Sequence, residues 1–391
     1  MKKICFIDRN IPYSTDLFQS LSENNTSSEF EILYVCPKYI EPQKISKDFT
    51  SKVRSIWTNE KYVKEIYEFL KEENPNLIHF SFELKTFGSL MSAIKFPFLL
   101  FKVKRLKLKI VLTLHNILII RKEEQWDIAE YNPTKIPRIL LKFFLKIYLK
   151  SICYFCDKII VGTNLGKFAL IDFYAIDKKK IEVIHLGIPK SKIIEQEQII
   201  KMNKRFNKMK IILYFGVISP RKGQENAINA FISSEKQLEN YCLVIVGKAP
   251  KEFRQYEERL HKIVVQNKLT NKIHFTGFLE ESEVHALFQM TKIALFIYAP
   301  MTSSTHALTY ALQNNIPSIV SDIEIFHEIL ENGSTYFVNP NNTITISKAL
   351  IELVKNENQQ KKIREKMKKL AKKYQIIFSA KKYLKIYSEL I

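Results

Sequence analysis

The alternation of two kinds of segment limits what this chain can fold into more than any other feature of its sequence. Short runs of β-branched and aromatic residues alternate with stretches of helical composition, which is typical of parallel sheets covered by helices. The expected strands are residues 3–7, 31–35, 77–81, 110–114, 158–161, 181–184, 211–215, 242–246, 273–275, 293–296, 317–320 and 335–338. The helices expected between them include residues 62–73, 137–153, 225–233, 255–267, 281–289 and 305–313. The pattern predicts an α/β fold with two similar, doubly wound halves.

The length of 391 residues also favours two domains, because one compact domain usually holds about 100–200 residues. Residues 191–210 are polar and charged and lack a strand pattern, so we expect a linker or an adjoining helix there. The predicted domains are residues 1–195 and 205–370, and residues 371–391 are expected to form a helix that returns to the first domain. Ligands of doubly wound sheets bind at the carboxyl ends of the strands, so two facing sheets would hold a ligand in the cleft between them.

Composition excludes several classes of protein. Hydrophobic residues make up 46% of the chain, too large a share for a disordered protein. Cys153 and Cys156 form one C-x-x-C in an apolar run, so with five cysteines in all we expect neither a disulfide framework nor a metal site. Asp8 and Arg9 end the first apolar run too early for a signal peptide, and no window of 18 uncharged apolar residues predicts a spanning helix. The chain is expected to be soluble or to lie on a membrane surface.

The loop in YFGVISPRKGQENAINAF, residues 214–231, is a candidate anion site. A strand is expected to end at Phe215, Gly216 opens a turn, and Lys222 and Gly223 lead into a helix. The free N–H groups of a helix N-terminus beside a lysine suit a diphosphate. The loop matches neither a Walker A sequence nor G-x-G-x-x-G, so an ordinary strand-to-helix turn is the alternative.

A second loop with the same potential lies in residues 298–322. The hydroxyl-bearing residues Thr302, Ser303, Ser304 and Thr305 precede the predicted helix 305–313. Hydroxyls at this point can cap the helix and add donors for an anion, and plain capping is the alternative interpretation. Because both loops leave strand ends in the same half, their helix N-termini can share one diphosphate.

Two polar residues follow strands in the first half. His115 follows the strand 110–114, where an imidazole would face the cleft and could donate to a substrate oxygen. Glu83 follows the strand 77–81 and could orient sugar hydroxyls. A structural histidine and a helix-capping carboxylate are the respective alternatives.

The order and spacing of several motifs resemble glycosyltransferase family 4, over most of the chain. The motifs are TLHNI (113–117), CDKIIVGTNLGKFAL (156–170), IEVIHLGIP (181–189), FGVISPRKGQENAINAF (215–231), LVIVGKAP (243–250), IHFTGFLEESEVHALF (273–288) and ALTYALQNNIPSIVSDIEIFHEIL (307–330). The resemblance implies the GT-B fold, in which two Rossmann-like domains face a central cleft. It also implies a retaining, metal-independent hexosyltransferase without a cofactor. Its donor would be a UDP- or GDP-linked sugar and its acceptor a lipid-linked or growing cell-surface glycan.

The resemblance also assigns roles to residues. The catalytic residues would be His115, Lys222 and Arg221, with Lys222 on the diphosphate and His115 beside the transferred sugar. Without a metal, the leaving diphosphate must be stabilised by lysine and by helix N-termini. The donor-binding residues would be Gly216, Ser219, Gly223, Gly277, Phe278, Thr302, Ser303, Ser304, Thr305, His306 and Tyr310. The acceptor-binding residues would be Asp8, Arg9, Asn10, Glu83 and Asn116.

Three positions depart from the family pattern. Val217 stands where many members have an arginine. Arg221, which is adjacent to Lys222, could replace that arginine. Thr302 and Tyr310 stand where many members have two glutamates, the second of which holds the ribose. The segment SSTHAL resembles a branch of the family with a small-residue loop of the type S-S-G-A-L. The alternative function is therefore an inactive GT-B homologue that serves as a glycan-binding or partner subunit.

The positive charge is concentrated in stretches that are also rich in aromatic residues. The net charge is +21, and residues 95–122 and 135–150 hold eight and five Lys/Arg with no acid. Such stretches can lie on anionic lipid, which predicts a cytoplasmic protein on the inner face of the cell membrane. The contacts predicted there are Lys102, Lys104, Arg105, Lys107 and Lys109, with Phe96, Phe98 and Phe101 in the interface. The alternative is a solvated helix face over core residues, and no motif indicates nucleic-acid binding.

Overall fold

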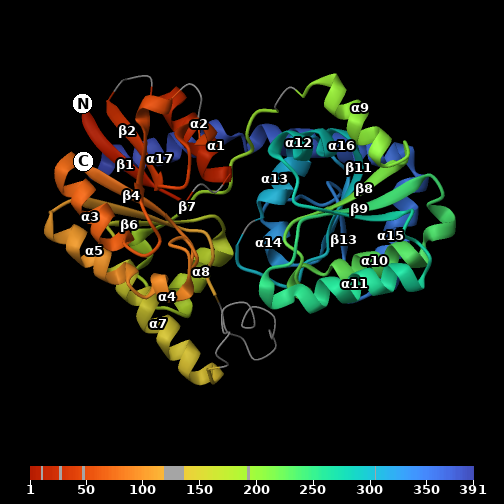
Figure 1. Ribbon diagram of the computed structural model, residues 1–391, viewed down its shortest axis with the longest axis horizontal. Helices are drawn as coiled ribbons and strands as arrows, with labels where there is room; N and C mark the ends of the chain where they lie inside the picture. Colours follow the sequence, from red (N-terminus) through yellow and green to blue (C-terminus); the bar gives the residue numbers. More distant parts are fainter. Residues whose placement is uncertain (10–11, 26–28, 46–48, 119–135, 192–193, 304) are drawn as a thin grey trace. The chain divides into compact units, whose positions relative to one another are not determined.

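The computed structural model describes residues 1–9, 12–25, 29–45, 49–118, 136–191, 194–303 and 305–391. The chain forms two compact units. The first comprises Met1–Gly187, Thr302–Ser304 and Tyr374–Ile391, and the second comprises Ile188–Met301 and Thr305–Lys373. In each unit a sheet of parallel strands lies between layers of helices (Figure 1). The predicted fold class, α/β with two doubly wound sheets, is confirmed.

The sheet of the first unit has seven strands in the order β3-β2-β1-β4-β5-β6-β7. The chain winds outward from β1 to β3 and then continues from β4 in the opposite direction, so the strand order reverses between β1 and β4. The two strands run parallel and in register from Ile4 opposite Leu77 to Ile7 opposite Phe80. The strands are β1 (Lys2–Ile7), β2 (Phe30–Pro37), β3 (Val53–Trp57), β4 (Leu77–Phe82), β5 (Lys109–Leu114), β6 (Lys158–Val161) and β7 (Ile181–Val183).

Helices cover both faces of this sheet because the strands are apolar on both sides, as buried parallel strands usually are. One face carries α3 (Tyr62–Glu73), α5 (Phe96–Arg105), α7 (Arg138–Phe155) and α8 (Asn164–Asp172). The other face carries α1 (Pro12–Asn24) and α17 (Ile376–Leu390), which pack against each other. The short helices α2 (Pro42–Ile45) and α4 (Leu90–Ala93) lie in connecting loops.

The C-terminal helix α17 is held in the first unit by a buried polar chain. His79 on β4 pairs through Nδ1 with the Tyr387 hydroxyl (2.6 Å) and through Nε2 with the Thr113 hydroxyl (2.7 Å). The Thr113 hydroxyl also lies 3.3 Å from that of Tyr383. Burial lowers the pKa of His79 to about 3, so the imidazole is neutral at pH 7.

The sheet of the second unit has six strands in the order β10-β9-β8-β11-β12-β13, so its strand order reverses between β8 and β11. The strands are β8 (Lys210–Phe215), β9 (Tyr241–Val246), β10 (Ile273–Gly277), β11 (Thr291–Phe296), β12 (Ser318–Ser321) and β13 (Tyr336–Val338). The helices are α9 (Gln196–Arg205), α10 (Gln224–Ser233), α11 (Arg254–Gln266), α12 (Glu281–Met290), α13 (His306–Gln313), α14 (Glu324–His327), α15 (Thr343–Lys355) and α16 (Glu357–Lys373).

All twelve expected strands correspond to strands of the two sheets, and one further strand, β3, was missed. Arg54 and Ser55 interrupt its apolar run, and β3 is the outermost strand, paired with β2 alone in the described part of the sheet. An outer strand needs less apolar surface, so its signal in the sequence is weaker. None of the helices in the described ranges combines the length and apolar character that crossing a bilayer requires.

The predicted membrane contacts between Phe96 and Lys109 lie in α5, in β5 and in the turn between them. The prediction is wrong for Phe96 and for the charge of Lys104. Phe96 is fully buried and stacks on Phe82, with ring centroids 4.3 Å apart. The Lys104 ammonium lies 2.7 Å from the carboxylate of Asp157, so its charge is already matched. Phe98 and Phe101 are exposed, as predicted. Because α5 is apolar on more than one side, its sequence did not show which side the sheet covers.

Candidate functional site

The strongest candidate site in the second unit lies where the strand order reverses, beyond the carboxyl ends of β8 and β11. Adjacent loops diverge at such a point, which leaves room for a ligand. The loop after β8 carries Lys222, and the loop after β11 carries Tyr298. The Lys222 ammonium lies 3.7 Å from the centroid of the Tyr298 ring, a cation–π contact. The backbone N–H of Ala299 also donates to the carbonyl of Arg221 (2.9 Å), so the two loops support each other.

Gly223 shapes the loop after β8. Its φ of 67° ends the short 3₁₀ turn Pro220–Lys222, and α10 begins at the next residue. A Cβ at this position would collide with the carbonyl oxygen of Ile297, so only glycine fits. Gln224 then donates from Nε2 to the carbonyl of Val217 (2.9 Å) and closes the loop on itself. We did not predict Gln224, whose burial is visible only in the folded structure.

A row of glycines leaves the carboxyl edge of three neighbouring strands without side chains. The N–H of Gly247 donates to the carbonyl of Gly277 (2.9 Å), and the Cα of Gly247 faces the carbonyl of Gly216. A Cβ at Gly216 or Gly277 would meet no described atom within 4 Å. Phe278 follows this row and is 78% exposed. A flat ligand could therefore approach the backbone here, and Gly247 is a member that the sequence analysis missed.

The loop after β11 differs from expectation at its helix. Thr305 precedes α13, but its side chain accepts no capping hydrogen bond from the described backbone of that helix. Thr302 and Ser303 belong to the first unit, where their hydroxyls donate to the carbonyl of Ile117 and to Oδ1 of Asn116 (2.7 Å). Their donors are therefore committed to protein acceptors. Ser304, like Asn10 among the predicted acceptor-binding residues, lies outside the described residues.

Tyr310 occupies the interior of the second unit. It is 6% exposed and stacks on Phe288, with ring centroids 5.0 Å apart, while the rings of His306 and Phe215 lie 4.9 and 5.8 Å away. Its ring thus packs among other rings, and its place among the donor-binding residues stays a prediction. Ser219, another predicted donor-binding residue, is also buried.

The first unit carries a matching cluster where its own strand order reverses, beyond β1 and β4. Arg9, which follows β1, forms an ion pair with Glu83, which follows β4, and donates from Nη1 to the carbonyl of Lys85 (3.1 Å). Asn116, beyond β5, donates from Nδ2 to the Glu83 carboxylate (3.3 Å). Asp8 is buried and accepts from the Tyr34 hydroxyl (2.8 Å). The structure thus joins four of the predicted acceptor-side residues at one edge of the sheet.

His115 lies beside this cluster at the end of β5. Its Nε2 is 2.7 Å from the Ser81 hydroxyl, which is 3.1 Å from that of Ser14. Burial lowers the pKa of His115, although the nearby carboxylates of Asp8 and Glu83 oppose the shift. A neutral imidazole at pH 7 can donate from one nitrogen and accept at the other. Ser81 and Ser14, which orient the ring, gave no signal in the sequence.

Neither cluster contains a set of side chains typical of a metal site. Among the described residues, no group of three or more His, Cys, Asp or Glu side chains could hold an ion together. Near the end of β8, Lys222, Arg221 and the N-terminus of α10 bring positive charge to the candidate site.

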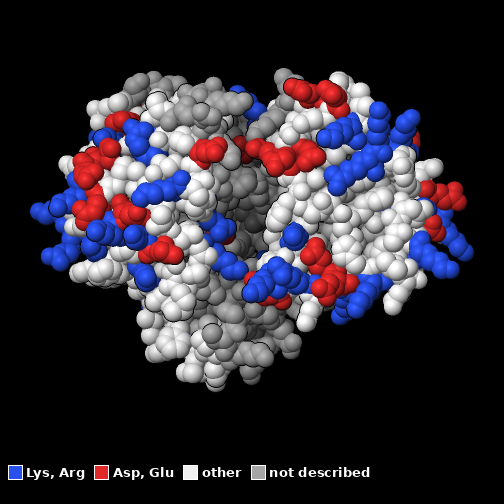
Figure 2. All heavy atoms as spheres, in the orientation of Figure 1, with Lys and Arg blue, Asp and Glu red and all other residues white. Residues whose placement is uncertain are grey.

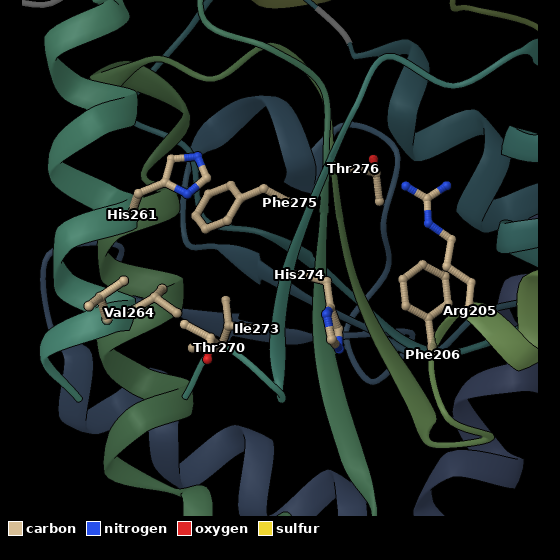
Figure 3. Close-up of a pocket in the computed structure, with 10 residues that line it drawn as sticks. Arg205, Phe206, His261, Val264, Thr270, Ile273, His274, Phe275 and Thr276 are labelled. Carbon is tan, nitrogen blue, oxygen red and sulfur yellow. The ribbon is translucent and has the colours of Figure 1, made fainter. Parts of the chain in front are cut away.

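A cavity of about 350 Å³ lies elsewhere in the second unit, along the outer edge of β10 (Figure 3). His261 packs against Phe275 on one side of the strand, and His274 packs near Phe206 on the other. Arg205, at the end of α9, completes the second side. None of the predicted site residues lines this cavity, which is separated from β8 by β9.

Two protein families match consecutive parts of the chain. Residues 195–373 match the family described as glycosyl transferases group 1, and residues 25–192 match the family described as glycosyltransferase family 4. The curated relatives include the O-antigen chain mannosyltransferase RfbU of Salmonella typhimurium, 27% identical over 240 residues, or 59% of this chain. An uncharacterized glycosyltransferase of Methanocaldococcus jannaschii, MJ1069, is 26% identical over 261 residues, or 62% of this chain. The alignments span 61% and 64% of the lengths of these relatives.

Solved structures share the fold over the whole chain. The crystal structure of Anabaena HepE in complex with UDP and glucose superposes with a TM-score of 0.76. The two proteins are 14% identical, and the match covers 100% of both chains. At this identity the likeness concerns the fold, and it extends to both doubly wound sheets.

Proposed function

Since this chain belongs to glycosyltransferase family 4, we propose that it transfers a hexosyl group from a nucleotide-sugar to a lipid-linked or growing cell-surface glycan. We propose that the anomeric configuration is retained and that no metal ion or other cofactor takes part. The name of RfbU, an O-antigen chain mannosyltransferase, supports a role in surface polysaccharide synthesis. The UDP and glucose held by HepE support a nucleotide-linked hexose as donor.

The observation that carries this proposal is the position of Lys222. Its ammonium is held over the Tyr298 ring at the point where the sheet of the second unit reverses, next to the first turn of α10. A leaving diphosphate gains negative charge as its bond to the sugar breaks. A preorganised cation and the positive end of the α10 dipole stabilise that charge most in the transition state, which accelerates transfer.

The other donor-side residues would surround the same ligand. Arg221 would supply a second positive charge. It would replace the arginine that many family members have at the position of Val217. The glycine row at Gly216 and Gly277 would admit the nucleotide to the backbone, with exposed Phe278 beside the base. Thr305 and His306, at the start of α13, would lie near the phosphate and sugar.

The acceptor would bind the first unit, in this proposal, beside His115 and Glu83. Neutral His115 would form a hydrogen bond with the transferred sugar. The Glu83 carboxylate already accepts from Arg9 and Asn116. Its remaining lone pairs would accept hydrogen bonds from acceptor hydroxyls and so orient them. The bond between the anomeric carbon and the phosphate oxygen would break, and the acceptor oxygen would bond to that carbon on the same face. The acceptor proton would pass to the leaving phosphate.

The nucleotide is the first point to test. Thermal unfolding of the full chain with UDP, GDP, ADP or dTDP should show a higher Tm with one of them, because a ligand at about 100 times its Kd stabilises by about 2.7 kcal/mol. UDP- and GDP-sugars should then release that nucleotide only when membrane-extracted lipid-linked glycans are added. If a nucleotide binds but no acceptor leads to its release from the nucleotide-sugar, the protein is the inactive homologue. No shift with any nucleotide would contradict the donor site itself.

We also propose that the enzyme works at the inner face of the cell membrane, where a lipid-linked acceptor is presented. The high positive charge supports this location, because the cytoplasmic leaflet carries a negative surface potential.

A further inference from the structure

Helix α7 has an unusual amount of apolar surface on its outer side. Leu149, Ile152 and Cys153 belong to the core of the first unit, and Leu145 and Tyr148 pack against it. The helix is nevertheless apolar beyond this side, where five large residues between positions 139 and 147 are exposed. They are Ile139 (82%), Leu140 (48%), Phe143 (60%), Phe144 (55%) and Ile147 (52%).

These five residues lie on one side of the helix. At about 100° per residue, positions 139, 143 and 147 and positions 140 and 144 form two adjacent rows, turned away from the core positions 145, 149 and 152. The surface over α7 that is visible in Figure 2 is accordingly white, with few charged atoms. The described end of α7 extends past the strands of its own unit (Figure 1). We call the five residues the outer face of α7.

Lysines border this face along one side. Lys142, Lys146 and Lys150 follow one another at intervals of one turn and are all exposed. Their row lies between the core side and the outer face. Residues 136–156 contain no aspartate or glutamate that would neutralise them.

The neighbouring helix α5 extends the apolar and basic surface. α5 packs against α7, and the exposed ring of Phe101 contacts Phe155 near the end of α7 (centroids 6.1 Å apart). The Lys102 ammonium covers the Tyr67 ring at 4.2 Å, and Arg105 lies near the Phe101 ring. The charged ends of Lys102 and Arg105 thus lie over aromatic rings, so basic and aromatic groups share this surface.

We propose that the outer face of α7 inserts into the interface of an anionic lipid bilayer, with Lys142, Lys146 and Lys150 on the headgroups. Exposed aromatic and aliphatic side chains beside a row of lysines are typical of helices that lie in the plane of a membrane. We favour lipid over a protein partner because a row of three lysines, with no acidic residue in residues 136–156, complements an anionic surface. The attachment is independent of catalysis. Only its purpose, to bring the acceptor-binding unit to lipid-linked glycans, rests on the proposed function.

The test is flotation of the full-length protein with vesicles, without any substrate. One set of vesicles is phosphatidylcholine, and the other contains about a third phosphatidylglycerol. The wild type should float with the anionic vesicles and partly remain bound at high salt, because the apolar contribution is not screened. The variant F143Q/F144Q/I147Q should partition at least tenfold less at both salt concentrations. The variant K142Q/K146Q/K150Q should lose binding mainly at low salt.

Matched controls come from the second unit. I344Q/V265Q removes exposed apolar residues, and K361Q/K362Q/K368Q removes exposed charges from α16. Both should float like the wild type. A wild type that stays unbound to anionic vesicles at low salt would overturn the proposal. Variants of α7 that float like the wild type would also overturn it. A third contrary result would be a dimer, detected by light scattering, that the substitutions F143Q/F144Q/I147Q dissociate, because the outer face would then join two copies of the chain.

Two further measurements separate this proposal from the proposed function. The α7 variants should keep the wild-type Tm and its shift with nucleotide, which shows that they fold and bind the donor. They should also retain transfer to a water-soluble acceptor while losing at least tenfold with vesicle-bound acceptor. Flotation without any transfer would leave the attachment intact and contradict the enzyme assignment. Transfer without flotation would support the enzyme assignment and contradict the membrane attachment.

Discussion

The ammonium of Lys222 and the ring of Tyr298 form a cation–π pair across the two strands at which the second sheet reverses its order. Arg9 and Glu83 make the equivalent connection in the first sheet, as an ion pair between the loops after β1 and β4. Each pair joins residues that are distant in the chain and adjacent in the sheet. Each lies at the reversal point of its sheet, where doubly wound folds generally bind their ligands.

Replacement of Lys222 by alanine should reduce transfer by about 100-fold or more while the fold survives, because one lost electrostatic stabiliser of a transition state costs that much. The measurement is kcat with a saturating nucleotide-sugar. Lys292→Ala, at the exposed start of β11, is the matched control and should leave turnover unchanged. Equal turnover in the Lys222→Ala protein would contradict the donor site.

Tyr298 should act by positioning Lys222. Tyr298→Phe keeps the aromatic ring and should retain kcat/KM within about threefold. Tyr298→Leu removes the cation–π contact, which is worth about 2 kcal/mol when desolvated, so kcat/KM should fall by about 30-fold. Nucleotide-induced shifts of the Tm show whether the leucine variant is folded. A folded leucine variant with wild-type turnover would show that Lys222 needs no such support.

Tyr310→Glu should lower the stability of the fold, with a smaller effect on chemistry. The substitution places a carboxylate among Phe288, His306 and Phe215, and burying an unpaired charge costs several kcal/mol. Tyr310→Phe, which keeps the ring stack, should change the free energy of unfolding by no more than about 1 kcal/mol. Urea unfolding measures both. A glutamate variant with wild-type stability and tighter nucleotide binding would place this position in contact with the ribose.

Acid should destabilise the first unit through His79. Its pKa is about 3 in the folded chain because of burial and about 6.5 when unfolded, so between these values the unfolded state binds the additional proton. Stability therefore falls as the pH decreases from 6.5 towards 3, by up to about 1.4 kcal/mol per pH unit from this group. Unfolding by urea at pH 7, 5.5 and 4.5 should show a shallower decline in His79→Gln. If the free energy of unfolding falls equally with pH in the wild type and in His79→Gln, His79 is not the cause of the acid sensitivity.

Much of the fold could be predicted because its signals are local. A buried parallel strand such as 242–246 is apolar throughout, and the glycine at 223 stands where a turn requires a left-handed conformation. The loops with Lys222 and Glu83 could be located for the same reason, since each follows a recognisable strand. The roles of Tyr298, Ser81 and Gln224 could not be predicted, because each depends on a neighbour from another strand or turn.

The sequence by itself determined the alternation of strands and helices, the glycine-containing turns and the surplus of positive charge, because each is a property of neighbouring residues. Only the tertiary structure decided which apolar side chains are covered. Phe96 is enclosed beside Phe82, whereas Phe143 and Phe144 face outward from a helix of similar composition. The physical reason is that a helix with apolar residues on all sides has no preferred inner face until a sheet packs against one of them.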